Sequence, residues 1–287
     1  MTKLMKGHTW AKGKHKLTYP ASAEVKVDEI RLDVRFEENC LLFRSYADKP
    51  LHNIPNAHCR AFGNFMTAFE VQRLDMGVIV NRNFADTYRY VRSSKGVPPE
   101  LVDAKVEYIL FDLPGMGTLP YIERIQWRKR YCNIMADYRL PVFVPVRKVV
   151  YDEAEVLNMF DSVRHDGDEG LMVKDHAGLY ELDKRTNGWL KVKPEADCDG
   201  IVLGYSEVVS EAGEPLGRVG SLRVEAHLPD GSTQLVNVPG IPHEIGMAWF
   251  QDPSLIVGQW VEFSYMERDR QGGFRHPRFG RIREAKA

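Results

Sequence analysis

The spacing of hydrophobic and polar residues predicts several strands in the first half of the chain. Short β-like runs, in which apolar and polar positions alternate, extend over 23–43. A strongly apolar strand is expected within 106–115, where Pro114 and Gly115 close it. The stretch 69–81 is interpreted as a hairpin with 75–77 in its turn, because aspartate and glycine favour turns.

Two helices are expected further along. Apolar residues recur at near-helical spacing within 118–138, which predicts a surface helix with a basic outer face; they are Ile122, Ile125, Tyr131 and Ile134. Asp152 and Glu155 have the spacing of a helix N-cap and its reciprocal partner. The apolar stripe that follows supports a second helix, which the glycine-containing stretch 165–170 ends.

The pattern changes after Pro194. Strand-like runs are now interrupted by turn sequences about every ten to fifteen residues, a spacing typical of a small all-β barrel. A boundary within 194–197 therefore divides the chain into an α+β domain, residues 1–195, and a β domain, residues 196–287.

Composition and charge narrow the range of functions. The formal net charge of −1 gives no whole-molecule signal for nucleic acid, yet both ends are basic. Residues 1–20 contain five lysines and no acidic residue, and residues 264–287 contain seven Arg or Lys against three acidic residues. Such ends can bind phosphates. With no apolar run of membrane-spanning length and no signal-peptide pattern, we expect a cytoplasmic protein without a membrane partner.

Two lysines near residue 190 point to an anionic ligand. Strand alternation places Trp189, Lys191 and Lys193 on one face of a strand. Neighbouring ammonium groups repel each other unless they share an anion, and a polyphosphate is the natural candidate.

Acidic residues and a further lysine extend this group. Glu70 and Glu169 are carboxylates that could hold a divalent cation bridging phosphate oxygens. Lys26 and Asp28 are expected on the same face of a strand. Because nearby cations lower the pKa of a lysine, Lys26 is a candidate nucleophile.

Six stretches, taken in order, resemble the covalent nucleotidyltransferases, and most of all the small ATP-dependent DNA ligases of bacteriophages. They are K-V-D-E-I-R (26–31), F-R-S (43–45), F-E-V (69–71), L-F-D (110–112), E-G-L-M-V-K (169–174) and W-L-K-V-K-P (189–194). The ending, with R-H-P-R-F-G-R-I-R at 275–283, is similar to the closing strands of the OB domain in those enzymes. The resemblance implies an α+β, ATP-grasp-like nucleotidyltransferase domain followed by an all-β OB-fold domain.

The resemblance also implies roles for individual residues. Lys26 would attack the α-phosphate of ATP, Glu24 would help to recognise the adenine, and Phe111 would stack on it. Glu70 would contact the ribose or a metal-bound water, and Glu169 would bind the metal. The remaining residues are Lys191 and Lys193 for the α-phosphate, Arg31 and Arg44 for the sugar or the nick phosphate, Arg275 and Arg278 for the pyrophosphate, and Asp28 and Lys174 without an assigned role.

The chain departs from the family pattern at two places. The family has x-D-G after the lysine, whereas here Glu29 stands where the glycine is usual. The usual D-G-E is also absent: 68–70 keeps only Glu70, and 74–77 keeps an aspartate without the glutamate. We assign the acidic position to Glu70, which leaves 74–77 free to form the turn.

The resemblance implies a monomeric enzyme that uses ATP and Mg²⁺ to seal nicks between a 5′-phosphate and a 3′-hydroxyl in double-stranded DNA. An RNA ligase or an mRNA capping guanylyltransferase would share the lysine chemistry. A nick-binding protein that has lost catalysis is a further alternative, because Glu29 alters the pattern beside the lysine.

Overall fold

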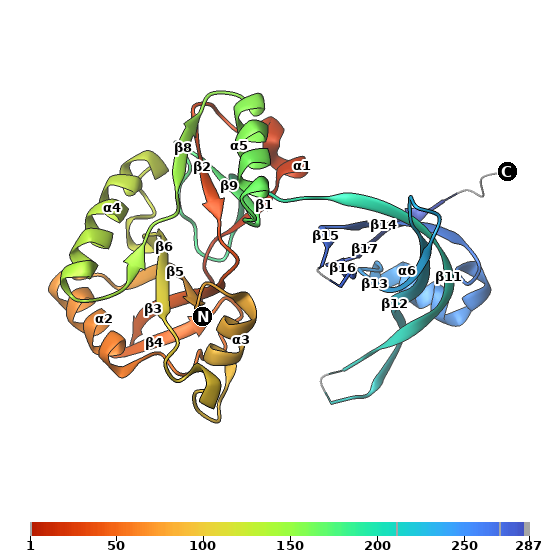
Figure 1. Ribbon diagram of the computed structural model, residues 1–287, viewed down its shortest axis with the longest axis horizontal. Helices are drawn as coiled ribbons and strands as arrows, with labels where there is room; N and C mark the ends of the chain where they lie inside the picture. Colours follow the sequence, from red (N-terminus) through yellow and green to blue (C-terminus); the bar gives the residue numbers. More distant parts are fainter. Residues whose placement is uncertain (1, 211, 270, 284–287) are drawn as a thin grey trace. The chain divides into compact units, whose positions relative to one another are not determined.

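The computed structural model describes residues 2–210, 212–269 and 271–283. The chain divides into two compact units, Met1–Lys193 and Pro194–Ala287, so the division lies two residues before the expected end of the first domain. Each unit has its own hydrophobic core. The first unit mixes helices and sheets and the second is mostly β (Figure 1), which confirms the predicted α+β class.

Two five-stranded sheets form the first unit. One has the strand order β1-β10-β9-β2-β8 and the other β4-β3-β5-β6-β7. The strands of the first sheet are β1 Lys6–Thr9, β2 Ala21–Lys26, β8 Arg147–Val150, β9 Gly170–Asp175 and β10 Arg185–Val192. Those of the second are β3 Ile30–Glu37, β4 Cys40–Ser45, β5 Arg73–Val80, β6 Val106–Asp112 and β7 Val142–Phe143.

Helices cover the outer faces of the two sheets. They are α1 Trp10–Gly13, α2 Asn56–Ala68, α3 Phe84–Arg92, α4 Tyr121–Asp137 and α5 Glu153–His165. In Figure 1, α2 and α4 lie beside the β3–β6 sheet, and α5 lies beside β2, β8 and β9. Both predicted helices are present as α4 and α5, and the Asp152 carboxylate accepts a hydrogen bond from the Glu155 backbone N–H, as an N-cap does.

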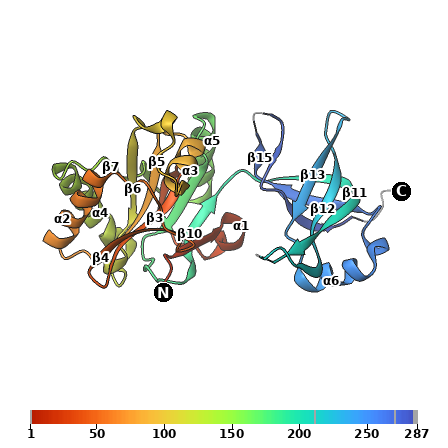
Figure 2. The same ribbon diagram turned by 90° about the horizontal axis from the view of Figure 1, so that it is seen from below.

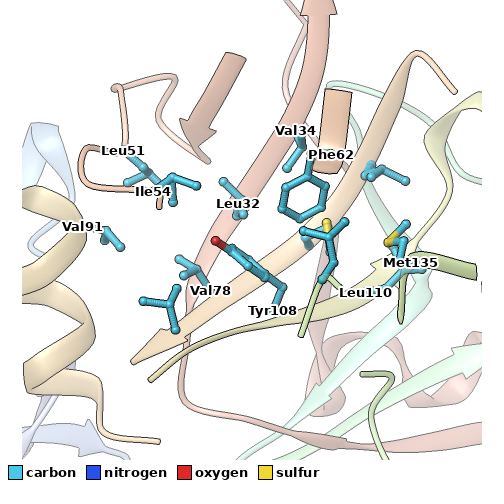
Figure 3. Close-up of a cluster of buried hydrophobic side chains, with 14 of the residues drawn as sticks. Leu32, Val34, Leu51, Ile54, Phe62, Val78, Val91, Tyr108, Leu110 and Met135 are labelled. Carbon is cyan, nitrogen blue, oxygen red and sulfur yellow. The ribbon is translucent and has the colours of Figure 1, made fainter. Parts of the chain in front are cut away.

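The larger core of this unit lies between the second sheet and its helices (Figure 3). Leu32 and Val34 of β3 pack there with Phe62 of α2 and Tyr108 of β6. Because side chains alternate along a strand, the odd-numbered residues of β3 project to the opposite face, toward the first sheet. The core therefore fixes which side chains of β3 reach the space between the sheets.

The hairpin expected at 69–81 is wrong. Residues 73–80 form one strand, β5, in which every residue is buried, and Asp75 and Gly77 lie in its middle. Apolar residues at 74, 76, 78 and 80 alternate along it and pack into the core. Burial of this central strand outweighs the local turn preference of aspartate and glycine.

The described part of the second unit contains a curved five-stranded sheet, a two-stranded sheet formed by β15 and β16, the helix α6 and a short 3-10 helix. Its strand order is β13-β12-β11-β14-β17, and contact between β13 and β17 brings the outer strands together. The elements are β11 Ala196–Val209, β12 Pro215–His227, β13 Thr233–Pro239, α6 His243–Gln251, β14 Trp260–Tyr265, β15 Glu267–Arg268, β16 Phe274–Arg275 and β17 Arg278–Ile282. Figure 2 shows α6 beside β12, where Trp249 joins the core. Across the described residues, no helix combines the length and the apolar character needed to cross a membrane.

Candidate active site

Three neighbouring strands bring alternate side chains to the cleft between the sheets. Leu171, Val173, Leu190 and Val192 face the core beneath α5, so their sequence neighbours face the other way. On β2, the residues that face the cleft are Glu24 and Lys26. They pair with Met172 and Gly170 of β9. On β10 the corresponding residues are Trp189 and Lys191, as the sequence predicts, and they pair with Lys174 and Met172.

Gly170, which pairs with Lys26, lies directly against the backbone of Val192. A Cβ atom at this position would lie 2.2 Å from the Val192 carbonyl oxygen, and the backbone φ of 147° also favours glycine. Lys26 and Lys193 both donate to the carboxylate of Glu169, one to each oxygen, and the Glu169 side chain is only 7% exposed. The first unit therefore gathers two cations and one anion at the end of β2.

The charge state of Lys26 differs from the sequence-based expectation. Burial alone would lower its pKa, but the carboxylates of Glu29 and Glu169 outweigh burial and raise the pKa. The expected lowering by nearby cations is therefore wrong for the ligand-free protein. Lys191 does behave as expected of a lysine among cations: burial, and then Arg185 and Lys193, lower its pKa to about 8.

Asp28 does not share a strand face with Lys26, because β2 ends at Lys26 and β3 begins at Ile30. Both Asp28 and Glu29 lie in the short connection between these strands, and the charge of Asp28 adds to the rise in the pKa of Lys26. Glu29 lines the cleft and has no left-handed φ, so the residue that replaces a glycine adopts an ordinary backbone conformation.

Glu24 is the centre of a buried ion-pair network. Arg128 of α4 donates to both of its oxygens, at 2.5 and 3.1 Å, Lys174 lies 2.9 Å away, and the Tyr121 hydroxyl also donates to it. Burial would raise the pKa of Glu24, but Lys174 and Arg128 lower it to about 2. The network therefore satisfies both carboxylate oxygens within the protein, which favours a positioning role over direct adenine recognition.

The same network holds Phe111 at the cleft. The Phe111 carbonyl accepts hydrogen bonds from Arg128 at 2.9 Å and from Lys174 at 3.0 Å, while its ring lines the cleft. Lys174 is 1% exposed and its Nζ lies 4.1 Å from the centre of the Trp189 ring. Lys174 thus fixes the aromatic residue that the sequence predicts as the base platform.

Arg31 is held by Asp75. Two hydrogen bonds of 2.8 and 2.5 Å join its guanidinium to the Asp75 carboxylate, which also accepts one of 2.8 Å from the Tyr180 hydroxyl. Asp75 has no exposed side-chain surface. The stretch 74–77, which the sequence analysis assigns to a turn, therefore contributes a residue beside the cleft.

Glu70 does not reach this site, so its selection as the acidic residue is not supported. It is exposed and follows α2, whose Phe62 and Phe65 pack on the sheet face opposite the cleft. The four residue steps from Arg73 to Gly77 add a further ~13 Å along β5. Arg44 lies on β4 opposite Asp33 of β3, the strand that also carries Arg31, and it is not among the residues that line the cleft.

Sequence reasoning missed the buried arginines that α4 contributes. Arg124, on the predicted outer face, is fully buried and forms a two-bond ion pair of 2.7 and 3.0 Å with Asp112. Arg128 lies one turn later and pairs with Glu24. The i, i+4 spacing of the arginines is a visible signal, but their partners come from distant strands.

The remaining predicted residues lie in the second unit. Arg275 is at the end of β16 and donates to Glu267 at 2.6 Å, and exposed Arg278 begins β17. This unit also has the larger hollow, of about 1120 Å³, lined in part by Arg268, Arg281 and Asp199. We assign the chemistry to the smaller cleft of the first unit, because it contains the lysine and the aromatic platform.

Two facing sheets with a lysine at their cleft, followed by a β unit, define a nucleotidyltransferase-type architecture. The chain belongs to the ATP-dependent DNA ligase family: the family model described as "ATP dependent DNA ligase domain" matches residues 11–193. The second unit is consistent with the expected OB domain.

The comparisons with individual proteins agree with this membership. The chain is 30% identical to the DNA ligase of Enterobacteria phage T3 over 146 residues, which are 47% of this chain and 38% of the relative. The matched part thus spans about two fifths of that relative's length. A structure from a study of Lig E DNA ligases with a minimal DNA-binding scaffold is similar, with a TM-score of 0.68, 20% identity and coverage of 99% of this chain and 100% of that one. The bacteriophage T7 ATP-dependent DNA ligase, in complex with ATP, gives a TM-score of 0.56 at 20% identity, covering 98% of each chain. At these identities the structures support the fold alone.

Proposed function

We propose that this protein is an ATP-dependent DNA ligase that seals nicks in duplex DNA through an AMP adduct on Lys26. Family membership supports the reaction class. The main support is the position of Lys26. It lines the cleft together with Phe111, and Glu169 accepts hydrogen bonds from both Lys26 and Lys193. A nucleotide whose base lies on Phe111 would present its phosphates to these lysines.

The reaction would take place in three steps. The neutral Lys26 amine attacks the α-phosphorus of ATP, a nitrogen–phosphorus bond forms, the α–β phosphoanhydride bond breaks and pyrophosphate leaves, while the nitrogen gives up one proton to solvent or to the leaving pyrophosphate. An oxygen of the DNA 5′-phosphate then attacks the same phosphorus, and the lysine leaves as an amine that takes up a proton. In the last step the 3′-hydroxyl attacks the phosphorus of the DNA 5′-phosphate, loses its proton and expels AMP.

The chain's own residues would bind and orient the nucleotide. Lys191 and Lys193 would neutralise the α-phosphate, because Lys191 lies on the cleft side of β10, and Lys193, directly after that strand, shares the Glu169 carboxylate with the nucleophile Lys26. Arg31, fixed by Asp75, would address the sugar or the nick phosphate. Before attack the Lys26 ammonium must lose a proton, which the surrounding carboxylates now stabilise.

The donor set near Lys26 fits Mg²⁺. This ion usually takes one or two protein carboxylates and completes its coordination with phosphate oxygens and water. Glu169 is the residue that would hold it, once its oxygens are released from Lys26 and Lys193. A bound Mg²⁺ supplies charge neutralisation at the phosphate oxygens.

The DNA partner would be a nicked duplex, which basic residues of both units would bind through its phosphates. The enzyme would act as a monomer in the cytoplasm. Basic residues at both ends of the sequence support a salt-sensitive grip on the DNA backbone. A nick-sealing assay at increasing salt, with sedimentation analysis of the free and DNA-bound protein, tests both points.

Incubation of the protein with ATP labelled at the α-phosphate tests the proposal. A covalent AMP adduct that survives denaturation is expected, followed by transfer to a nicked DNA duplex and sealing. No adduct would reject the enzyme and favour a binding protein. An adduct with GTP in place of ATP would indicate capping chemistry, and sealing of RNA strands alone would indicate an RNA ligase.

A further inference from the structure

Gly77 lies where the Glu29 side chain and the Phe111 ring occupy the space that a side chain at position 77 would need. A Cβ atom added at Gly77 would lie 2.8 Å from Cγ of Glu29 and 3.0 Å from Cε2 and Cζ of Phe111. Contacts below 3.0 Å force a neighbour to move. Residue 77 must therefore be glycine as long as Glu29 takes its present position, so the two residues depend on each other.

The side chain of Glu29 shares the cleft with its two functional groups, Lys26 and Phe111. Its Cγ and the Phe111 ring both lie over Gly77, and Glu29 is also the carboxylate with the largest charge effect on Lys26. All three residues line the same cleft. The cleft thus contains a carboxylate near both the aromatic platform and the nucleophilic amine.

The other acidic residues of this region are already engaged. Glu24 accepts hydrogen bonds from Arg128 and Tyr121, Asp75 from Arg31 and Tyr180, and Glu169 from two lysines. Within the described part of the chain, no donor forms a hydrogen bond to the Glu29 carboxylate; burial raises its pKa, and the charges of Lys26 and Arg31 oppose that rise without cancelling it. Glu29 is therefore the cleft carboxylate whose oxygens can accept hydrogen bonds from a ligand.

We propose that Glu29 accepts hydrogen bonds from the ribose hydroxyls of the bound nucleotide, and that Gly77 is the glycine that makes room for it. The inference rests on the proposed function: with the base on Phe111 and the α-phosphate at Lys26, the group between them is the sugar. Two vicinal hydroxyls match the two oxygens of a carboxylate.

The sequence pattern supports an exchange of positions between residues 29 and 77. Aligned on Asp75, the D-G-E pattern places its glutamate at Gly77, so this chain has glycine where the pattern has glutamate and glutamate where it has glycine. The register of β3 and β5 pairs Arg31 with Gly77. A side chain at 77 would therefore project on the Arg31 side, into the space that Glu29 now fills.

A comparison of nucleotides and variants tests the ribose assignment. Adduct formation from ATP, 2′-deoxy-ATP and 3′-deoxy-ATP is measured with the wild type and with Glu29→Gln, with exposed Glu38→Gln as the matched control. For the wild type and the control, loss of a hydroxyl should slow adduct formation about tenfold or more, because an acceptor of the site is left without its donor. Glu29→Gln should be slow with ATP and should distinguish the three nucleotides by less than about threefold.

Other results would overturn the assignment. Full discrimination by Glu29→Gln would mean that another group recognises the ribose. If the discrimination persists and the Mg²⁺ concentration for half-maximal rate rises, Glu29 serves a cation instead. Calorimetry gives a readout without turnover. It measures the affinities of Lys26→Ala and of Lys26→Ala/Glu29→Gln for ATP and its deoxy forms, and these affinities must show the same pattern. A wild type without any adduct rejects the proposed function itself, whereas a wild type with adduct and an unaffected Glu29→Gln rejects only this inference.

The exchange can be built directly. Glu29→Gly should lose the carboxylate, and Gly77→Glu should displace the side chain of Glu29, so each single variant should form adduct slowly. The double variant Glu29→Gly/Gly77→Glu should recover at least about tenfold over either one and should again distinguish ATP from its deoxy forms. Thermal melting shows whether each variant is folded. A folded double variant no faster than Glu29→Gly would contradict the exchange, and if the double variant does not fold, the comparison with Glu29→Gln decides the assignment.

Discussion

Glu24 and Lys26 project from the same face of β2, yet each is paired with a different set of partners. Glu24 pairs with Arg128 and Lys174 in a buried network, whereas Lys26 pairs with Glu169 at the end of the strand. The Lys26 side chain is 18% exposed, compared with 2% for Glu24. A single strand therefore carries a fixed structural anion and, one pleat later, an amine within reach of a ligand.

The nucleophile is the first point to test. Lys26→Ala should abolish the AMP adduct, and Lys26→Arg should do the same, because a guanidinium stays protonated at neutral pH and does not attack phosphorus. The adduct is measured with labelled ATP on denaturing gels, with exposed Lys16→Ala as the control. Normal labelling of either Lys26 variant would reject Lys26 as the attachment site.

The structure reverses the expected ranking of Glu70 and Asp75. Asp75→Asn should lower the free energy of unfolding by about 3 kcal/mol or more, because the buried Arg31 guanidinium loses its counter-charge. It should also slow adduct formation, since Arg31 is no longer fixed. Exposed Glu70→Gln should change the free energy of unfolding by less than about 0.5 kcal/mol. Urea unfolding and adduct rates test both variants, and a stronger effect at Glu70 would restore the original assignment.

Glu24 should make stability sensitive to acid. Its pKa is depressed to about 2 from the ordinary value of 4.5, so its contribution is fully present above pH 4.5 and is lost as the pH falls toward 2. The difference corresponds to roughly 3 kcal/mol. Glu24→Gln should be destabilised at pH 7 and should lose less further stability between pH 5 and 2.5 than the wild type. Equal acid slopes for the two proteins in chemical unfolding would argue against the network.

Lys191 should make nucleotide binding depend on pH. Because its pKa is lowered to about 8, the ammonium loses its charge as the pH rises through 8. The affinity for an ATP analogue with a methylene bridge between the α- and β-phosphates should therefore fall severalfold from pH 7 to 9. Binding near pH 8 should take up a proton, which calorimetry in buffers of different ionisation enthalpy detects. Lys191→Arg, which stays charged, should flatten this dependence; an unchanged slope would exclude Lys191 as its source.

Arg275 and Arg278 should affect one step and spare another, if they orient pyrophosphate. Arg275→Ala and Arg278→Ala should then slow adduct formation about tenfold or more, yet seal a nick that already carries the 5′-adenylate, because that step expels AMP. If they contact only DNA, adduct formation should be normal and sealing should weaken, with a smaller salt dependence. Exposed Arg223→Ala on β12 is the control. Adduct formation at the wild-type rate in both variants would reject the pyrophosphate role.

Local patterns predicted those parts of the site that depend on one strand or one helix. The alternation in 189–193 correctly predicts which residues of β10 face the cleft. Every second residue is buried in the core, so the residues between them must face the other way. Asp152 marked the start of α5 because capping depends on a few adjacent residues. The site residues Lys26 and Phe111 were found through family motifs, and the structure brings them to one cleft.

Residues whose roles depend on distant partners were not predictable in this way. In the sequence Arg128 has the pattern of a solvent-exposed helix residue, because its partner Glu24 lies on β2, 104 positions away in the chain. Asp75 and Gly77 have turn-like character in isolation, and only the strands on both sides of β5 make them interior. The dependence of Gly77 on Glu29 likewise exists only after β3 and β5 pair.

The shared carboxylate of Glu169 has one more consequence. Lys26 and Lys193 would repel each other in an empty site, but Glu169 accepts a hydrogen bond from each and keeps the two ammonium groups close. The repulsion is thus overcome when the protein folds, and an arriving phosphate would replace one oxygen anion, the carboxylate, with another. The site is assembled before its substrate arrives, so binding requires little reorganisation.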